Sequence, residues 1–158
     1  MTSMSLPSMS EINIQNTNTL SSNPIDFSTI FVKRQDGKSM SDIRHINLSN
    51  TGFWSGNSGV NSFPVDIQNY NKLKTIDISN GCVTSLALPN AALSSILITN
   101  STIERVTLAD QPFISKVDFT GCNKLQSVEI SNCNQITELD LRNLNDLTSI
   151  NVIGCAKL

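Results

Sequence analysis

The feature that most constrains the fold is a short repeat in the second half of the chain. From residue 73 the sequence divides into eight units: LKTIDISNGC, VTSLALPNAA, LSSILITNST, IERVTLADQPF, ISKVDFTGCNK, LQSVEISNCNQ, ITELDLRNLND and LTSINVIGCAK. Three units have ten residues, the following five have eleven, and positions 1, 4 and 6 of every unit are apolar. This self-similarity predicts a repeat architecture.

The spacing within each unit predicts a β-strand. Positions 4 and 6 lie two residues apart, so a strand directs both side chains to one face and turns positions 3 and 5 outward. One unit cannot bury its apolar row alone, but stacked copies make the row continuous. Asn, Ser, Gly and Pro at the unit ends supply corners.

Two units should form one coil of about 20 to 22 residues, with two parallel sheets running along the stack. We expect the strands near Ile76, Ile96, Val117 and Leu139 in one sheet, and those near Leu86, Val106, Val128 and Ile150 in the other.

Three segments, ITELDLRNL, LQSVEISNC and LTSINVIGC, follow the pattern L-x-x-L-x-L-x-x-(N/C). In this they resemble the leucine-rich repeat family, specifically its short bacterial nested type. The resemblance covers residues 73 to 158 and, more loosely, 43 to 72. It implies a parallel sheet that commonly binds proteins, in a family with few enzymes. The chain departs from the pattern through Ile and Val at many Leu positions and varied ninth positions, so a right-handed β-helix of another kind is the alternative fold.

The predicted fold class is therefore mainly β: a leucine-rich-repeat-like parallel solenoid over residues 41–158, preceded by an extended N-terminal arm over residues 1–40. IRHINLSNT (43–51) repeats the rhythm through Ile43, Ile46 and Leu48, and VNSFPVDIQ (60–68) repeats it through Val60, Phe63 and Val65. A loop insertion spans residues 49–59. In the arm, INIQ and FSTIFVK predict strands and RQDGK predicts a turn.

Composition excludes several classes of function. Ser, Asn and Thr supply 54 of 158 residues, charged residues only 15%, and the net charge is −2. Such a chain offers no basic field for nucleic acid or for an anionic membrane. No apolar run reaches the length of about 18 residues that a transmembrane helix needs. The start lacks a basic segment followed by an apolar one, so we expect no signal peptide, and a location in a virion or other assembly, or otherwise in the cytoplasm.

The four cysteines do not predict a catalytic or metal site. Cys122, Cys133 and Cys155 share the ninth position of their units, and none of the four forms a zinc spacing. We interpret them as thiols that pack as small apolar groups. Because Cys133 and Cys155 fall in adjacent coils, a disulfide between them is the alternative. No histidine lies nearby to activate a thiol, and we predict no catalytic, cofactor-binding or metal-binding residue.

Two groups of residues form the candidate interaction surface. The first is a weakly acidic stripe at position 5 of one sheet, made of Asp77, Asp118 and Asp140 with Glu138 beside it. It could receive a basic partner or calcium; alternatively, it serves solubility and protects against stray strand pairing.

The second group is Phe53 and Trp54, in a Gly/Ser-rich segment. These aromatic side chains could contact a sugar or a protein, or fold back and cap the first coil. His45 falls at an outward position and is predicted to be a surface histidine.

Together these features predict a non-enzymatic structural or interaction protein. Its arm would dock on a larger assembly, as in a phage fibre, baseplate or decoration protein, or in an adhesin. Leu158 opens a further unit without a polar cap, so we expect more chain, another copy or a partner to cover that end. The expected partners are proteins, a surface glycan or a homo-oligomer. The alternative is an intracellular leucine-rich-repeat binding module or effector; a carbohydrate-active β-helix enzyme would need clustered acids in a cleft, which the repeat does not supply.

Overall fold

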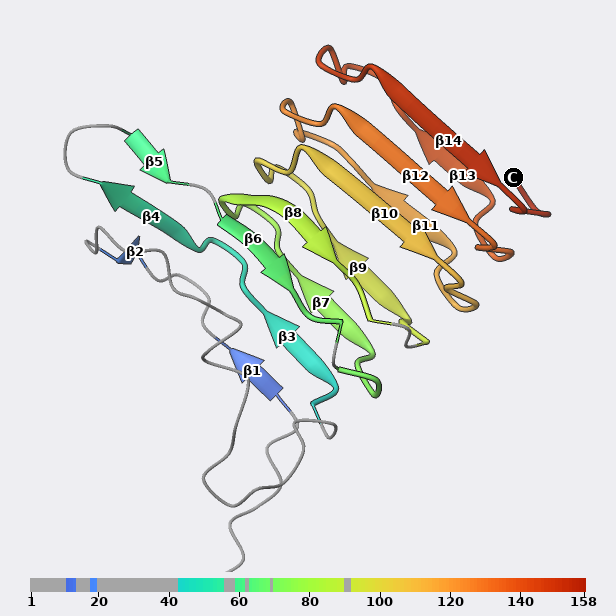
Figure 1. Cartoon of the computed structure of the whole chain (residues 1–158), viewed down its shortest axis with the longest axis horizontal. Coiled ribbons are helices and arrows are strands. Elements are labelled where there is room, and N and C mark those ends of the chain that lie inside the picture. The colour runs from blue at the N-terminus through green and yellow to red at the C-terminus, as the bar shows by residue number, and fades with distance from the viewer. Residues whose placement is uncertain are drawn as a thin grey trace, which may run out of the picture.

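The computed structural model describes residues 11–13, 18–19, 43–55, 59–61, 63–68, 70–89 and 92–158. Within these residues every regular element is a strand, and the strands stack as a parallel β-solenoid of about four turns (Figure 1). The predicted mainly β, parallel solenoid is thereby confirmed.

Successive strands of the solenoid alternate between two sheet layers. The first layer holds β1 (Glu11–Asn13), β3 (His45–Asn47), β7 (Thr75–Asp77), β9 (Ser95–Leu97), β11 (Lys116–Asp118) and β13 (Glu138–Asp140). The second layer is one five-stranded sheet of β6 (Phe63–Asp66), β8 (Val83–Ala87), β10 (Arg105–Ala109), β12 (Ser127–Ser131) and β14 (Ser149–Ile153). Figure 1 shows the second layer in front, ordered from green to red along the stack.

The strand register confirms the predicted division between the two layers. Ile76 pairs with Ile96 in the first layer, and Val128 pairs with Ile150 in the second. The first layer is nevertheless divided into a four-stranded sheet, β1-β3-β7-β9, and a two-stranded one, β11-β13. The step between equivalent residues is 20 from β7 to β9, 21 from β9 to β11 and 22 from β11 to β13. The ladder is interrupted between β9 and β11, whereas the second layer stays one sheet through a step of 21 from β6 to β8 and a change from 20 to 22 at β10.

The core is the continuous column of side chains from positions 1, 4 and 6. In the coil 114–135 these are Ile114, Val117, Phe119, Leu125, Val128 and Ile130, and all are buried. In the coil 136–157 Leu139 and Val152 are only partly buried, and Ile150 is 53% exposed. Among the described residues, this coil has a neighbour on one side only.

Position 8 of each unit makes the sharpest corner. The described residues at this position all have positive φ: Asn50, Asn80, Asn100, Asp110, Asn132 and Asn143 between 53° and 64°, Gly121 at 76° and Gly154 at 67°. Asn, Asp and Gly adopt this left-handed conformation more easily than other residues do. The corner amide points along the stack: Asn132 N donates to Ile153 O of the next coil at 2.9 Å. The repeat indicated corners at unit ends but not this position.

The predicted register of residues 60–68 is wrong. Val65 pairs with Leu86, so Val65 occupies position 4 and Ile67 position 6, and both are buried. The predicted first residue, Val60, belongs instead to β5 (Gly59–Asn61), and the ladder of β6 shifts register between Phe63 and Pro64.

The insertion after β3 is a hairpin rather than an open loop. β4 (Gly52–Ser55) pairs antiparallel with β5, and β2 (Asn18–Thr19) adds to β4 in parallel. From the arm, β1 pairs with β3 and extends the first layer, which confirms a strand near INIQ. The segments FSTIFVK and RQDGK lie outside the described residues.

Replacing Ile130 by Ala should lower the free energy of unfolding by about 2–5 kcal/mol, because the change leaves a cavity in the core. The Ile130 side chain is only 1% exposed. Glu129→Ala in the same strand is the control; its side chain is exposed, and the change should cost less than about 0.5 kcal/mol. Chemical denaturation measures both, and equal losses would show that the strand faces were assigned incorrectly.

Replacing Gly121 by Ala should cost more than about 1 kcal/mol, because the residue is left-handed. An added Cβ would also lie 2.0 Å from Asn100 Oδ1. In the double variant Asn100→Gly/Gly121→Ala the steric part should be recovered, since glycine at 100 removes the facing amide. If the effects of the two single changes simply add in the double variant, the contact between residue 121 and Asn100 is contradicted.

Candidate interaction surface

The carboxylates at position 5 of the first layer close the turns that follow their strands. Asp77 Oδ1 accepts from Ser79 N at 2.9 Å and from Ser79 Oγ at 2.6 Å. Asp118 Oδ1 accepts from Thr120 N at 2.9 Å, and Asp140 Oδ1 from Arg142 N at 3.0 Å. Each bond forms an Asx turn, in which a side-chain oxygen caps the backbone two residues on.

Asn47 occupies the same position in β3 and makes the same bond without a charge, since its Oδ1 accepts from Ser49 N at 3.0 Å. The turn therefore accounts for Asp or Asn at position 5 of these four strands, whereas Leu97 fills that position in β9. A negative charge is not required for it.

Local partners also set the electrostatics of these groups. Arg142 holds Asp140 with Nε–Oδ1 at 2.9 Å and Nη2–Oδ2 at 2.6 Å. These bonds keep the pKa of Asp140 well below its ordinary value. Hydrogen bonds from Thr120 lower the pKa of Asp118. Both carboxylates are engaged within their own turns.

The structure brings only part of the predicted acidic stripe together. Asp118 lies opposite Asp140, and Lys116 lies opposite Glu138. Asp77 pairs with Leu97, so β9 separates it from the other two aspartates. Across the residues that the structure describes, no group of three or more His, Cys, Asp or Glu could hold a metal ion. Asp118, Asp140 and Glu138 therefore lie on neighbouring strands, with Lys116 opposite Glu138, and Asp77 lies apart from them.

The aromatic candidates lie in the hairpin. Phe53 and Trp54 both belong to β4, where Trp54 pairs with Val60 of β5. Their side chains lie outside what the structure describes, so their predicted contact with a partner stays a prediction. His45 is exposed on β3, with Nδ1 2.8 Å from Thr75 Oγ1, as expected of a surface histidine.

A broader surface covers the outside of the second layer, and none of its residues belongs to the two predicted groups. We call it the second-layer face and define it by the outward residues of β8, β10, β12 and β14, none of which is buried. These are Ser85, Ala87, Arg105, Thr107, Ala109, Ser127, Glu129, Ser131, Ser149, Asn151 and Ile153. Only Arg105 and Glu129 of this set carry a charge. In the sequence, the short polar residues at positions 3 and 5 of alternate units could have indicated this surface.

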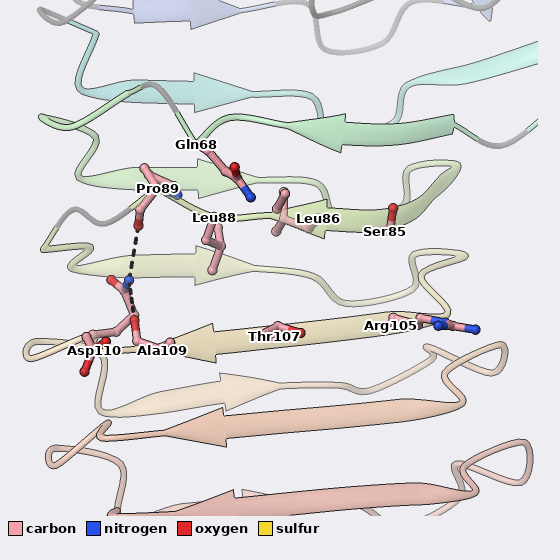
Figure 2. A pocket seen from close by; sticks show the side chains of 11 residues that line it. Gln68, Ser85, Leu86, Leu88, Pro89, Arg105, Thr107, Ala109 and Asp110 are labelled. Carbon is pink, nitrogen blue, oxygen red and sulfur yellow. Dashed lines mark hydrogen bonds between the residues drawn. The ribbon is translucent and has the colours of Figure 1, made fainter.

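The second-layer face contains a groove between β8 and β10. These strands pair only through Arg105 with Ser85 and Val106 with Leu86, whereas β10 and β12 pair over five positions. Beyond the short ladder the strands diverge around a volume of about 590 Å³, with Arg105 at one end and Asp110 at the other (Figure 2).

Gln111, at position 9 behind the groove, joins its two sides. Its Nε2 donates to Ala109 O at 3.0 Å and to Pro89 O at 3.4 Å, the bonds dashed in Figure 2. Its Oε1 accepts from Leu93 N at 3.2 Å. The buried amide replaces the ladder bonds that the diverging strands lack.

The cysteines are all free thiols, and Cys122 and Cys133 are fully buried. Cys122 Sγ lies 3.0 Å from Ile98 O and Cys133 Sγ lies 3.4 Å from Ser131 O, each as a donor. Burial raises the pKa of both thiols, and that of Cys82 as well. These thiols pack inside their corners, and burial lowers the fraction of thiolate from which any reaction of Cys122 or Cys133 must start.

No family model, curated protein or solved structure matches this chain. In the part of the chain that the structure describes, no helix is long and apolar enough to cross a membrane.

Acid should destabilise the fold through Asp118 and Asp140. Their pKa values are depressed in the folded state, so their contribution is present above the unfolded value of about 4 and is lost as pH falls through the folded values. The thermal midpoint should therefore fall between pH 4 and pH 2.

The double variant Asp118→Asn/Asp140→Asn keeps both turn acceptors but cannot titrate, so its midpoint should fall less over this range. Glu129→Gln, which removes one carboxylate from the opposite layer, is the control. An unchanged acid profile in the double variant would show that these two turns do not contribute to the pH dependence.

Proposed function

We propose that this protein is a non-enzymatic structural and interaction protein. Its N-terminal arm docks on a larger assembly, and its solenoid presents a binding surface. The setting we favour is a phage virion component, such as a fibre, baseplate or decoration protein, or an adhesin. The observation that carries the proposal is the second-layer face.

The chemistry of the second-layer face suits contact with another macromolecule. Short side chains such as Ser127 and Ser149 place hydroxyl groups on neighbouring strands. Arg105 separates Ser127 from Ser85, and the groove hollows the face between β8 and β10. Short side chains lose little rotamer entropy when a partner orders them. Because the face carries little charge, it would recognise shape and hydrogen-bonding groups on a protein or a surface glycan.

Strand pairing by the arm supports its role in docking. β1 adds in parallel to β3, and β2 adds in parallel to β4, over three and two residue pairs. Extended segments commonly dock by adding a strand to a sheet edge, because main-chain hydrogen bonds supply the affinity. In our proposal the arm uses the same kind of contact on the assembly.

The coil 136–157 offers a second contact, which further solenoid coils, a partner or another copy could cover. Ile153 is 60% exposed and Leu158 is 52% exposed, and β14 is the last strand of its sheet. Exposed apolar side chains beside an edge strand favour association.

The alternative function is an intracellular leucine-rich-repeat module or effector that recognises one protein. The regular positions 1, 4 and 6 support this resemblance, and the varied ninth positions weaken it. The two functions differ in whether the chain travels with an assembly.

One experiment tests the proposal: mass spectrometry of native complexes purified with the tagged full-length chain. We expect it to co-purify with a multi-subunit assembly. Ser127→Arg, at the centre of the second-layer face, should weaken partner binding at least about ten-fold through a buried unpaired charge. Thr120→Arg, at an exposed corner of the other layer, is the matched control.

Removal of residues 1–40 should abolish incorporation into the assembly while partner binding through the face persists. Recovery of a single stoichiometric protein and no assembly would favour the alternative. Equal binding by Ser127→Arg and Thr120→Arg would rule out the second-layer face as the contact.

A further inference from the structure

Two cysteines occupy equivalent places in neighbouring coils. Cys133 follows β12 and Cys155 follows β14, each two residues after the strand ends. The strands pair in parallel register as far as Ser131 with Ile153. Equivalent residues of adjacent parallel strands lie about 4.8 Å apart, and the Cα atoms of a disulfide lie about 4.4–6.8 Å apart. The register places the two backbones at a suitable separation.

The corner that holds the cysteines is fixed by bonds between the same two coils. Asn132 N donates to Ile153 O at 2.9 Å, and Ala156 N donates to Asn134 Oδ1 at 3.3 Å. These bonds lie immediately before and after the two cysteines. They keep Cys133 and Cys155 in register beyond the last paired residues of β12 and β14.

Both thiols have the same local orientation. Cys133 Sγ donates to Ser131 O at 3.4 Å, and Cys155 Sγ donates to Ile153 O at 3.7 Å. Each thiol thus bonds the carbonyl two residues before it. Cys133 Sγ also lies 3.8 Å from Leu108 O of the preceding coil, so the Cys133 side chain must leave that contact to reach Cys155.

The two sulfurs differ in access. Cys155 is partly exposed, whereas Cys133 is buried. In the preceding coil the position equivalent to Cys133 is occupied by Gln111. The exposed member can meet a reagent from solution, and the buried member can meet only its neighbour.

We propose that Cys133 and Cys155 form a modification site at which a disulfide oxidant of the oxidised-glutathione type links the coils 114–135 and 136–157. The Cys155 thiolate attacks one sulfur of the oxidant, which forms a mixed disulfide and releases one glutathione thiolate. The Cys133 thiolate then attacks Cys155 Sγ and displaces the second glutathione. One sulfur–sulfur bond breaks and one forms, and the two cysteine protons end on the two reduced glutathione molecules.

The bond would fasten the coil that is least enclosed by the rest of the described structure. In this coil Ile150 is 53% exposed, and β14 pairs on one side only. A cross-link limits the open conformations of the loop that it closes. Oxidation should therefore slow local opening of β14, while the reduced coil opens more freely.

The test uses the full-length chain with oxidised glutathione, followed by alkylation of the remaining thiols and digestion without reduction. We expect a cross-linked peptide that contains Cys133 and Cys155, and a loss of two hydrogens from the intact mass. Amide exchange in Ser149–Ile153 should slow at least about ten-fold after oxidation and return on reduction.

Three variants make the test specific. Cys133→Ser and Cys155→Ser should fold, because Ser101 fills the ninth position of another unit in a buried state, and both should lose the cross-link. Cys122→Ser is the matched control, since the equivalent residues in its neighbouring coils are Ser101 and Leu144; it should form the cross-link as the parent does. Either of two results would overturn the proposal. The first is a stable glutathione adduct on Cys155 together with a Cys133 thiol that the alkylating reagent still labels. The second is a disulfide to Cys82, to Cys122 or between two copies of the chain.

Discussion

The hydrogen bonds on which this structure depends run from one coil to the next. Gln126 N donates to Glu104 O at 2.8 Å, and Thr148 N donates to Gln126 O at 2.9 Å. These three residues all stand at position 2 of their units, so each coil bonds the equivalent residue of the coil before it. A buried amide that missed its carbonyl would be costly. Each coil must therefore present its backbone at the spacing its neighbours require.

Most of the repeat follows from that requirement. Positions 1, 4 and 6 are apolar because they face the interior, and position 8 is Asn, Asp or Gly because the corner is left-handed there. Position 5 of the first layer favours Asp or Asn, because an oxygen closes the next turn. Position 9 accepts Thr51, Gly81, Ser101 or Cys122, which fill the space left inside the corner. Outward positions 3 and 5 of the second layer are the least constrained, and there a binding surface can vary.

The periodicity predicted the strands, their two layers and the core, because burial in a stacked coil imposes a strict pattern. It failed at residues 60–68, where Val60 fits the rhythm but pairs with Trp54 in a hairpin that no periodic rule anticipates. It also missed the break between β9 and β11, because the apolar pattern continues unchanged across it.

The acidic residues of the first layer have local roles that their charge did not indicate. The sequence emphasised Asp118 and Asp140, whose bonds are local to their own turns, and Asn47 already indicated that a neutral residue serves there. The groove beside Arg105 could not be predicted, because it arises where two strands diverge after a short ladder.

The direction of the hydrogen bonds has a mechanical consequence. The ladder bonds and the corner amides lie along the axis of the stack, and each coil contacts only its neighbours. A pull along the axis loads the bonds at one coil boundary in tension, so coils can peel away in turn. A pull along the strands loads a whole boundary in shear, and its bonds must break together. The solenoid is therefore anisotropic, and the direction in which an attached partner pulls decides how much force it withstands.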